Sequence, residues 1–253
     1  MTKRTAIVCL LLLFLSGTVG YGEERIRLTN GEWAPYTSAS MPGGGIMSQI
    51  ITEAFALSGI KVDYVYLTSW KRAYILAAKG RYDGSLTWAK TSEREKDFYF
   101  SDPVIAHDNV LFHLSSSPVV WQELADLKHL RISVTNAYFY GHKFHQALDA
   151  KTLNVFVVYE DIINFQNLFE GRIDAFPMDK NVGYHLLHTA FPEEKQRLVS
   201  HHPQVFSRFP TGLVISKRID KARALRLLKT FNEGLATLKS NGRYNELLSK
   251  FPQ

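Results

Sequence analysis

Two similar stretches of sequence decide the fold: residues 75–86 read ILAAKGRYDGSL, and residues 165–176 read FQNLFEGRIDAF. Each begins as a helix, continues through Gly-Arg-x-Asp and ends in a short apolar strand. Gly80 and Gly171 suit the position after a helix, because the left-handed conformation often needed there is hindered by a Cβ atom. A helix-to-strand unit used twice predicts two similar α/β lobes, and a cleft between two lobes is a common place for a ligand.

The elements around the two copies recur in the same order. The first half predicts strands at 26–28, 62–66 and 84–88, with helices at 47–55 and 70–78 between them. In the first of these helices, apolar residues fall on one face at helical spacing: Met47, Ile50, Ile51, Ala54 and Phe55. The second half predicts strands at 130–134, 155–159 and 173–176, with helices at 141–150 and 161–170. Asp161 is predicted to cap the last of these helices. Alternating strands and helices favour a mostly parallel sheet flanked by helices in each lobe.

Two later features are predicted to connect the lobes. Apolar residues 110–114 would cross from the first lobe to the second. A strand at 212–216 and helices at 220–238 and 244–251 have no sheet partners of their own, so they would return to the first lobe. We therefore expect residues 23–105 and 208–253 to form lobe 1 and residues 106–207 to form lobe 2. Strands near 105–110 and 206–211 would then be the hinge.

The start of the chain predicts export. Lys3 and Arg4 precede an apolar run at 6–15, and small residues follow at 16–22, which is the order of a cleaved signal peptide. The alternative is an uncleaved membrane anchor, but the run is short for a bilayer. Residues 1–22 are therefore predicted to be removed and the mature protein to be periplasmic. Cys9 is the only cysteine, so the mature chain would hold no disulfide and depend on its core.

The charge of the chain indicates no particular macromolecular partner. The 253 residues carry a formal net charge of +6, and the basic residues are scattered except at 217–229, which is typical of an exposed helix face. An exported protein meets little nucleic acid, so we expect no nucleic-acid partner. We interpret the positive net charge as a feature that keeps the protein soluble or attracts anions.

Candidate functional residues follow each copy of the repeat, whereas the repeat itself is interpreted as structural. Ser92 and Glu95 have the form of a capping box, which predicts a helix start with Arg94 in its first turn. An arginine and free backbone N–H groups at that position would hold an anion. The alternative is a solvated arginine that pairs with Glu93 or Asp97.

Asp179 lies just beyond the strand of the second copy, at the edge where open α/β sheets place their ligands. Its carboxylate would suit an ammonium group. The alternative is a helix cap ahead of residues 181–190. Trp33, Tyr36 and Trp70 lie on loops or at the edge of an element, where they would stack on a ligand or simply pack.

No motif indicates a metal, a cofactor or a catalytic centre. The pairs His142/His145 and His185/His188 have helical spacing, but neither has an obvious third ligand nearby, so we expect no metal. A Gly-rich phosphate loop, a nucleophile elbow and an HExxH motif are all absent from the sequence. A scattered Ser-His-Asp set stays open.

Several motifs in a fixed order carry a resemblance over essentially the whole mature chain. They are Trp33-Ala34-Pro35-Tyr36, Trp70, Gly80-Arg81-Tyr82-Asp83, Ser92-Glu93-Arg94, Phe100-Ser101-Asp102-Pro103, Leu124-Ala125-Asp126-Leu127-Lys128, Gly171-Arg172-Ile173-Asp174-Ala175 and Asn241-Gly242-Arg243-Tyr244. With them the chain resembles the bacterial extracellular solute-binding proteins of family 3, the amino-acid-type periplasmic binding proteins of ABC importers. The resemblance implies the two-lobed type II periplasmic-binding-protein fold.

The resemblance also implies roles for individual residues. Arg94 would hold a ligand α-carboxylate and Asp179 an α-ammonium, while Trp33 and Trp70 flank the ligand and Thr87 makes a polar contact. The complete expected ligand-binding set is Trp33, Tyr36, Trp70, Thr87, Trp88, Arg94, Tyr138 and Asp179.

The chain departs from the family pattern in two places. Ala89 stands where the family often has a small hydroxyl residue, and residues 136–140, NAYFY, stand where it has a Gly-Thr-Thr-like turn. Bulky aromatic residues thus replace a threonine that would contact the carboxylate. A smaller, more aromatic or differently charged ligand is expected.

The predicted function is that of a monomeric, non-enzymatic binding protein that delivers a small polar, amino-acid-like ligand to an ABC permease. One alternative is an exported enzyme of the same fold, similar to cyclohexadienyl dehydratase, with Glu32, Lys90 and the histidines as acid–base candidates. The other is a ligand-sensing protein whose partner is a membrane receptor.

Overall fold

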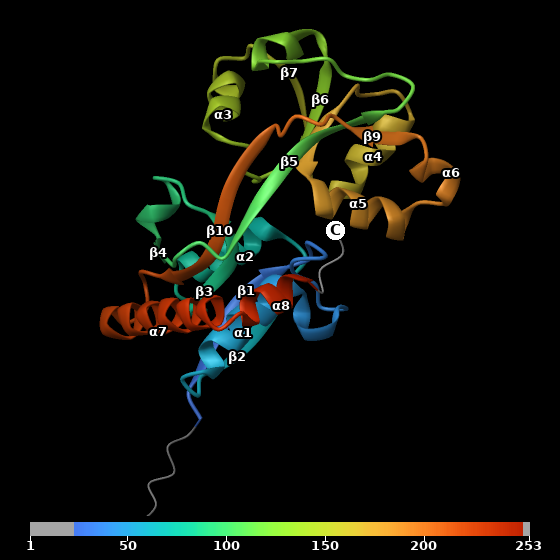
Figure 1. Ribbon diagram of the computed structural model, residues 1–253. Helices are drawn as coiled ribbons and strands as arrows, with labels where there is room; N and C mark the ends of the chain where they lie inside the picture. Colours follow the sequence, from blue (N-terminus) through green and yellow to red (C-terminus); the bar gives the residue numbers. More distant parts are fainter. Residues whose placement is uncertain (1–22, 250–253) are drawn as a thin grey trace, which may run out of the picture.

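The structure is a computed structural model that describes residues 23–249, so the predicted signal peptide lies outside the described residues. Two lobes are joined by two long strands, β5 and β10 (Figure 1). The strands are β1 (Arg25–Gly31), β2 (Lys61–Leu67), β3 (Gly84–Ala89), β4 (Phe98–Phe100), β5 (Ile105–Leu114), β6 (Arg131–Thr135), β7 (Asn154–Val158), β8 (Phe176–Asp179), β9 (Val199–His201) and β10 (Ser207–Ser216). The helices are α1 (Ile46–Ala56), α2 (Trp70–Ala78), α3 (His142–Asp149), α4 (Asp161–Phe169), α5 (Lys180–Ala190), α6 (Glu193–Gln196), α7 (Lys221–Ser240) and α8 (Arg243–Ser249), with short 3-10 helices at Pro42–Gly44, Arg94–Lys96 and Leu124–His129.

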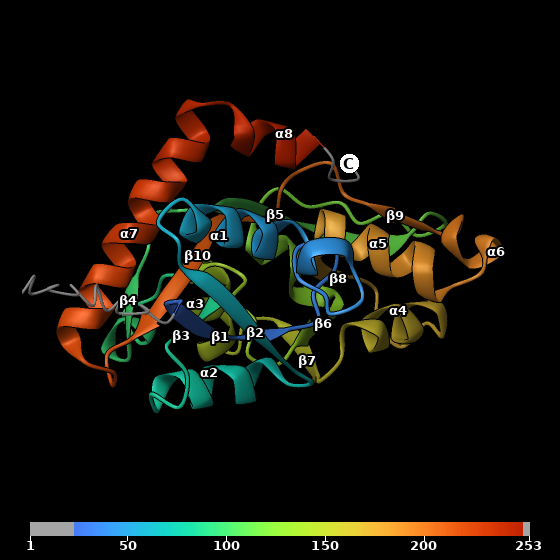
Figure 2. The ribbon, with the colours of Figure 1, turned by 90° about the horizontal axis from the view of Figure 1, so that it is seen from below.

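The main sheet is mixed and runs through both lobes. Its strand order is β2-β1-β3-β10-β5-β8, with β4 beside β10 and β9 beside β5. Strand β1 is parallel to β2 and β3, whereas β10 is antiparallel to β3 and β5. A second, parallel sheet of β6 and β7 lies in the upper lobe of Figure 1. Helices α1, α7 and α8 lie on one side of the lower-lobe strands and α2 on the other (Figure 2). The predicted α/β fold with flanking helices is confirmed.

Both copies of the repeat end a helix in the same way. Gly80 and Gly171 adopt φ of +69° and +64°, as predicted for left-handed residues after a helix. Gly80 N donates to Ala77 O, and Arg81 N donates to Leu76 O, the carbonyl one residue earlier in α2. The same pair of hydrogen bonds closes α4 around Gly171. The two copies therefore form the same backbone cap.

The aspartates of the repeat hold the first strand of each lobe in place. Asp83 Oδ2 accepts a hydrogen bond from Arg27 N at 2.8 Å, and Asp174 Oδ2 accepts one from Arg131 N at 2.7 Å. Asp174 also pairs with the Arg131 guanidinium at 2.7 Å, and this hydrogen bond lowers the pKa of Asp174. The residues of the repeat are structural, in line with their interpretation from the sequence.

The core of the first lobe forms between α1 and α7. The helical face expected from the sequence is fully buried, and Phe55 of α1 contacts Phe231 of α7 with ring centroids 5.4 Å apart. Gly234 allows the two helices to approach closely, because an added Cβ would lie 2.2 Å from a backbone carbonyl oxygen of α1. Helix α8 also contacts α1, because Arg243 donates hydrogen bonds to Glu53, so both C-terminal helices pack against the first lobe.

The two connecting strands lie where the sequence predicted strands. Strand β5 (Ile105–Leu114) covers the predicted 105–110 and 110–114, and β10 (Ser207–Ser216) covers the predicted 206–211 and 212–216 to within one residue. The first halves of the two strands pair with each other, from Ile105 opposite Thr211 to Asn109 opposite Ser207. The exact lobe boundaries within these strands stay a prediction.

Two predicted helix starts are wrong. Residues 92–95 form no capping box, and Arg94–Lys96 is a single 3-10 turn whose cap residue makes no side-chain hydrogen bond. Glu160, not Asp161, is the cap residue of α4, because the Asp161 carboxylate is used by Thr135 and Tyr138 instead. Within residues 23–249, no helix is both long and apolar enough to span a membrane.

Candidate functional site

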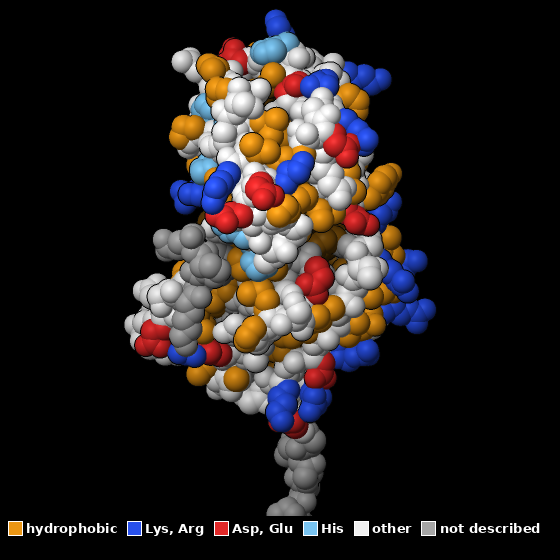
Figure 3. Space-filling view, turned by 90° about the vertical axis from the view of Figure 1, so that its right-hand side faces the viewer, with side chains coloured by type: hydrophobic (Ala, Val, Ile, Leu, Met, Phe, Trp, Pro, Cys, Tyr) orange, Lys and Arg blue, Asp and Glu red, His pale blue; other side chains and the backbone are white. Residues whose placement is uncertain are grey.

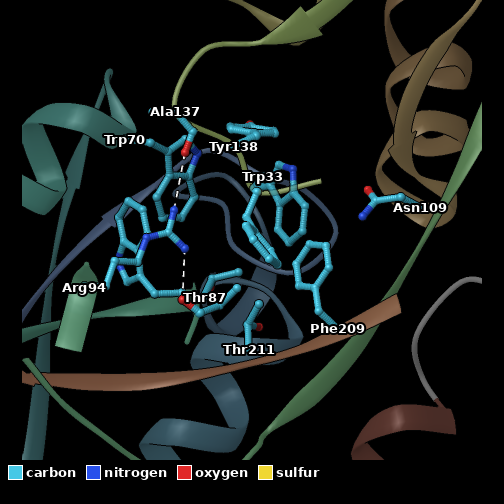
Figure 4. Close-up of a pocket in the computed structure, with 12 residues that line it drawn as sticks. Trp33, Trp70, Thr87, Arg94, Asn109, Ala137, Tyr138, Phe209 and Thr211 are labelled. Atoms are coloured by element: carbon cyan, nitrogen blue, oxygen red, sulfur yellow. Dashed lines mark hydrogen bonds between the residues drawn. The ribbon is translucent and has the colours of Figure 1, made fainter. Parts of the chain in front are cut away.

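A pocket lies between the lobes, where β3, β5 and β10 meet the loop that follows β6 (Figure 4). Its volume is about 60 Å³. It is lined by Trp33, Trp70, Thr87, Trp88, Ala89, Arg94, Asn109, Ala137, Tyr138, Phe139, Phe209 and Thr211. Side chains from both lobes therefore surround one small space.

Arg94 is held across the pocket by backbone carbonyls of both lobes. Its Nη1 donates to Ala89 O at 2.9 Å, and its Nη2 donates to Ala137 O at 3.4 Å (Figure 4). The guanidinium lies 4.8 Å from the centroid of the Trp88 ring, in cation–π contact. Burial lowers the pKa of Arg94 to about 10, so the side chain remains a cation at neutral pH.

The alternative that Arg94 is a solvated partner of Glu93 or Asp97 is wrong. Glu93 pairs with Lys96, and Asp97 accepts a hydrogen bond from Tyr74. Among the described residues, no carboxylate forms an ion pair with Arg94. A partly buried cation without a charged partner favours an anion beside it.

Thr87 has an unusual backbone and an unused hydroxyl. Its φ is +68°, and the register of β3 against β10 shifts at this residue, so Thr87 is the extra residue of a β-bulge. Its Oγ1 is buried and has no hydrogen-bond partner among the described residues. A β-branched residue in a left-handed conformation is strained, and such strain occurs often at binding sites. The bulge places a free donor at the pocket.

Aromatic rings form most of the pocket wall. Trp70 meets Trp88 edge to face at 5.6 Å, and Trp33 meets Tyr138 in the same way at 6.3 Å. Phe139 and Phe209 make a third such contact at 5.2 Å. The ring contacts pack edge to face, so the pocket is a largely apolar space with aromatic walls beside the Arg94 guanidinium.

The structure brings six of the eight predicted site residues to this pocket. They are Trp33, Trp70, Thr87, Trp88, Arg94 and Tyr138. Tyr36 and Asp179 are not among the lining residues. Sequence reasoning did not select Asn109, Phe209 and Thr211, which lie on β5 and β10. No motif marks these three residues, although their strands were the predicted hinge.

Asp179 is a helix cap, which was the alternative for this residue. It is 2% exposed, and its Oδ1 accepts hydrogen bonds from Asn181 N at 2.9 Å and Val182 N at 3.0 Å at the start of α5. Its Oδ2 accepts a hydrogen bond from Tyr36 OH at 3.1 Å and lies 3.3 Å from His107 Nδ1. Protein groups surround both carboxylate oxygens, so Asp179 caps α5, and its contact with a ligand ammonium stays a prediction.

The side chains around Asp179 link the lobes, and we call Tyr36, His107, Asp179, Asn181 and Thr211 the interlobe cluster. Asn181 Nδ2 donates to Tyr36 OH at 3.1 Å. His107 Nε2 lies 2.7 Å from Thr211 Oγ1, which reaches the pocket. Burial and the nearby Asp179 carboxylate raise the pKa of Tyr36, which stays protonated. The cluster therefore connects the loop after β1 with the strands β5, β8 and β10.

The acid–base candidates of the enzyme alternative lie elsewhere. Lys90 pairs with Glu95 at 2.9 Å, and Glu32 Oε1 accepts a hydrogen bond from Ala39 N at 2.8 Å. Glu32 and His185 line a wider cavity beside the pocket, together with Asp161, and this cavity shares Trp33, Trp70 and Tyr138 with the pocket. No group of three or more histidine, cysteine, aspartate or glutamate side chains within residues 23–249 is arranged to hold a metal ion.

A two-lobed α/β fold with a pocket between the lobes defines a ligand-binding protein of the type II periplasmic-binding class. The family model for bacterial extracellular solute-binding proteins, family 3, matches residues 27–253, and the chain belongs to that family. A comparison with curated proteins found no similar sequence.

Solved structures share the fold at low sequence identity. A histidine kinase sensor domain with similarity to periplasmic binding proteins has a TM-score of 0.75 at 17% identity, over 90% of this chain and 96% of that chain. The substrate-binding protein of an amino acid ABC transporter has a TM-score of 0.70 at 21% identity, over 90% of this chain and 98% of that chain. An ancestral amino-acid-binding protein, a precursor of cyclohexadienyl dehydratase, has a TM-score of 0.69 at 21% identity, over 90% of this chain and 95% of that chain.

Proposed function

We propose that this chain is a periplasmic solute-binding protein that captures a small, amino-acid-like carboxylate between its lobes and delivers it to an ABC importer. One observation carries the proposal: Arg94 is a partly buried cation with no acidic partner, inside an aromatic pocket shared by both lobes. An anion bound there would relieve the cost of burying the guanidinium charge.

Ligand binding would also favour the closed arrangement of the lobes. Arg94 follows β3 of the first lobe, and its contact with Ala137 lies in the second. A ligand that touches both lobes stabilises the conformation in which both contacts exist. In this proposal residues 23–105 and 208–253 move as one lobe against residues 106–207, with β5 and β10 as the hinge. The mature protein would act as a monomer that presents its closed form to the permease.

The test is isothermal calorimetry with the wild type and an Arg94→Ala variant, after a thermal-shift screen has found ligands. Arg94→Ala is expected to weaken carboxylate binding about 100-fold, since a charged hydrogen bond contributes about 1.5–3 kcal/mol. Arg172→Ala is the matched control, because Arg172 is exposed and pairs only with groups of its own lobe. Equal affinity in the wild type and Arg94→Ala would refute the proposal.

A sensing role is the second candidate, favoured by the similar fold of a histidine kinase sensor domain. The same pocket would then bind the ligand, and a membrane receptor would replace the permease. Uptake of labelled ligand by cells that lack the gene separates the two: uptake falls if the protein serves an importer and is unchanged if it serves a receptor. The enzyme alternative is less favoured, because Arg94 and Tyr138 are the only titratable side chains among the described lining residues.

A further inference from the structure

Resting on the proposed function, we infer that the ligand is a small monocarboxylate without an amino group: a short-chain fatty acid, 2-hydroxy acid or 2-oxo acid. The inference comes from the charge inside the pocket, from the two nearby carboxylates that are closed to a ligand, and from the volume that the aromatic rings leave.

The pocket offers positive charge and no negative charge. Arg94 is its one charged side chain, and no aspartate or glutamate is among the lining residues. An amino acid would bring its ammonium within a few bonds of the carboxylate held by Arg94. In a buried site that ammonium would be repelled by the guanidinium and left without an anionic acceptor.

Hydrogen-bond donors are available for a carboxylate. A guanidinium has five N–H groups, and Arg94 uses two of them on the carbonyls of Ala89 and Ala137. The unused Thr87 hydroxyl is a further donor at the pocket. The two carbonyl oxygens are already acceptors for Arg94. The free groups therefore suit an anion better than a cation.

Asp179, the carboxylate at the end of β8, is closed to a ligand. Two backbone N–H groups of α5 and the Tyr36 hydroxyl donate to it, and His107 lies against Oδ2. His107 and Asp179 are 0% and 2% exposed. The donors that a ligand ammonium would provide are thus supplied by the protein itself, and Tyr36 makes the link between the lobes.

Asp161, a carboxylate of the wider cavity beside the pocket, is closed as well. Its two oxygens accept hydrogen bonds from Thr135 Oγ1 at 2.6 Å and Tyr138 OH at 2.9 Å. Tyr138 is the residue that separates Asp161 from the Arg94 pocket, because its ring lines the pocket while its hydroxyl faces Asp161. Burial raises the pKa of Asp161, which weakens it further as an anionic partner.

The volume limits the size of the ligand. On the scale of the roughly 150 Å³ cavity known to hold benzene, which has six non-hydrogen atoms, a pocket of about 60 Å³ has room for about two to three such atoms. This is the size of a carboxylate group, and propionate, lactate and pyruvate have only two or three further non-hydrogen atoms to place beyond it. The rings of Phe139 and Phe209 occupy the space that a larger ligand side chain would need.

The test compares acids that differ only at carbon 2. The wild type is titrated by calorimetry with propionate, lactate, pyruvate and alanine, and with 3-phenylpropionate and phenylalanine as the larger pair. At least one of the three small amine-free acids is expected to bind, and alanine is expected to bind with an affinity about 10- to 100-fold lower than that acid. Both aromatic acids are expected to bind more weakly than their small counterparts. Arg94→Ala should weaken binding about 100-fold, and Thr87→Gly should weaken it as well, whereas Thr87→Ser should retain the wild-type affinity.

Each outcome is decisive. Alanine or phenylalanine binding more tightly than its amine-free analogue, with the affinity lost in Arg94→Ala, would overturn the inference and leave the proposed function standing. Tighter binding of 3-phenylpropionate than of propionate would overturn the size limit. If the folded wild type binds none of the six acids, the inference is refuted, whereas the proposed function is decided separately by the thermal-shift screen and the Arg94→Ala titration.

Discussion

Replacing Tyr36 with phenylalanine tests whether the interlobe cluster holds the lobes together. The Tyr36 hydroxyl donates to the Asp179 carboxylate and accepts a hydrogen bond from Asn181 Nδ2. A hydrogen bond to a charged group contributes about 1.5–3 kcal/mol and a neutral one about 0.5–1.5 kcal/mol. The phenyl ring keeps the packing of the buried side chain, so Tyr36→Phe is expected to lower the free energy of unfolding by about 2–4 kcal/mol.

Urea and thermal unfolding followed by circular dichroism measure this change. For a chain of this size, each kcal/mol corresponds to about 2–4 °C in Tm, so a fall of about 4–16 °C is expected. Tyr82→Phe is the matched control, because the Tyr82 ring contacts Arg27 and its hydroxyl makes no hydrogen bond within the described residues. Its free energy of unfolding is expected to stay within about 0.5 kcal/mol of the wild type.

Equal unfolding free energies for the two variants would refute the reasoning, since the cross-lobe bonds would then contribute nothing measurable. A companion titration adds a second readout. If Asp179 is closed to ligands in solution, Tyr36→Phe should not convert the protein into a tighter binder of alanine than of propionate. Such a reversal would mean that the hydroxyl alone keeps Asp179 from a ligand.

Three further predictions concern pH and packing. Arg131 holds the pKa of Asp174 below its unfolded value near 3.9, so their stabilisation is complete above about pH 5 and lost as pH falls through the native pKa. The difference in urea stability between the wild type and Asp174→Asn should therefore shrink from pH 6 to pH 3. Because burial lowers the pKa of Arg94 to about 10, carboxylate affinity by calorimetry should be constant from pH 6 to 8 and fall as pH approaches 10. Gly234→Ala should lower the free energy of unfolding by about 1–3 kcal/mol, since its Cβ would meet a backbone carbonyl of α1; an unchanged value would contradict the close helix contact.

Local signals in the sequence were sufficient to predict most of the fold. Gly80 and Gly171 mark helix ends because their left-handed conformation disfavours other residues, and this requirement acts within a few residues. The buried face of α1 was predicted for the same reason, since its periodicity depends only on helix geometry. The capping box at Ser92 failed because a four-residue pattern cannot show that the turn after it is too short for a helix.

The pocket was predictable where its residues follow a recognisable motif. Thr87 and Arg94 come directly after the first copy of the repeat, and both line the pocket. Phe209 and Thr211 reach the same space from β10, more than one hundred residues later, through pairing with β5 that no local pattern reports. The positive φ of Thr87 was likewise invisible, because it arises from the bulge against β10. The β-branched side chain of threonine favours the extended conformation of a strand, not a positive φ.

The role of Asp179 depends on residues far from it in the sequence. A carboxylate at the end of a strand can cap the next helix and still bind a ligand, because it has two oxygens. Here the second oxygen is used by Tyr36 and His107, which come from the loop after β1 and from β5. A ligand ammonium would have to displace a buried tyrosine hydroxyl and replace the contact that it makes between the lobes. The net binding free energy contributed by the ammonium would therefore be small. In the proposed site, the contact that links the lobes thus removes the anionic half of a zwitterion site, and Arg94 would be left as the charge that selects the ligand.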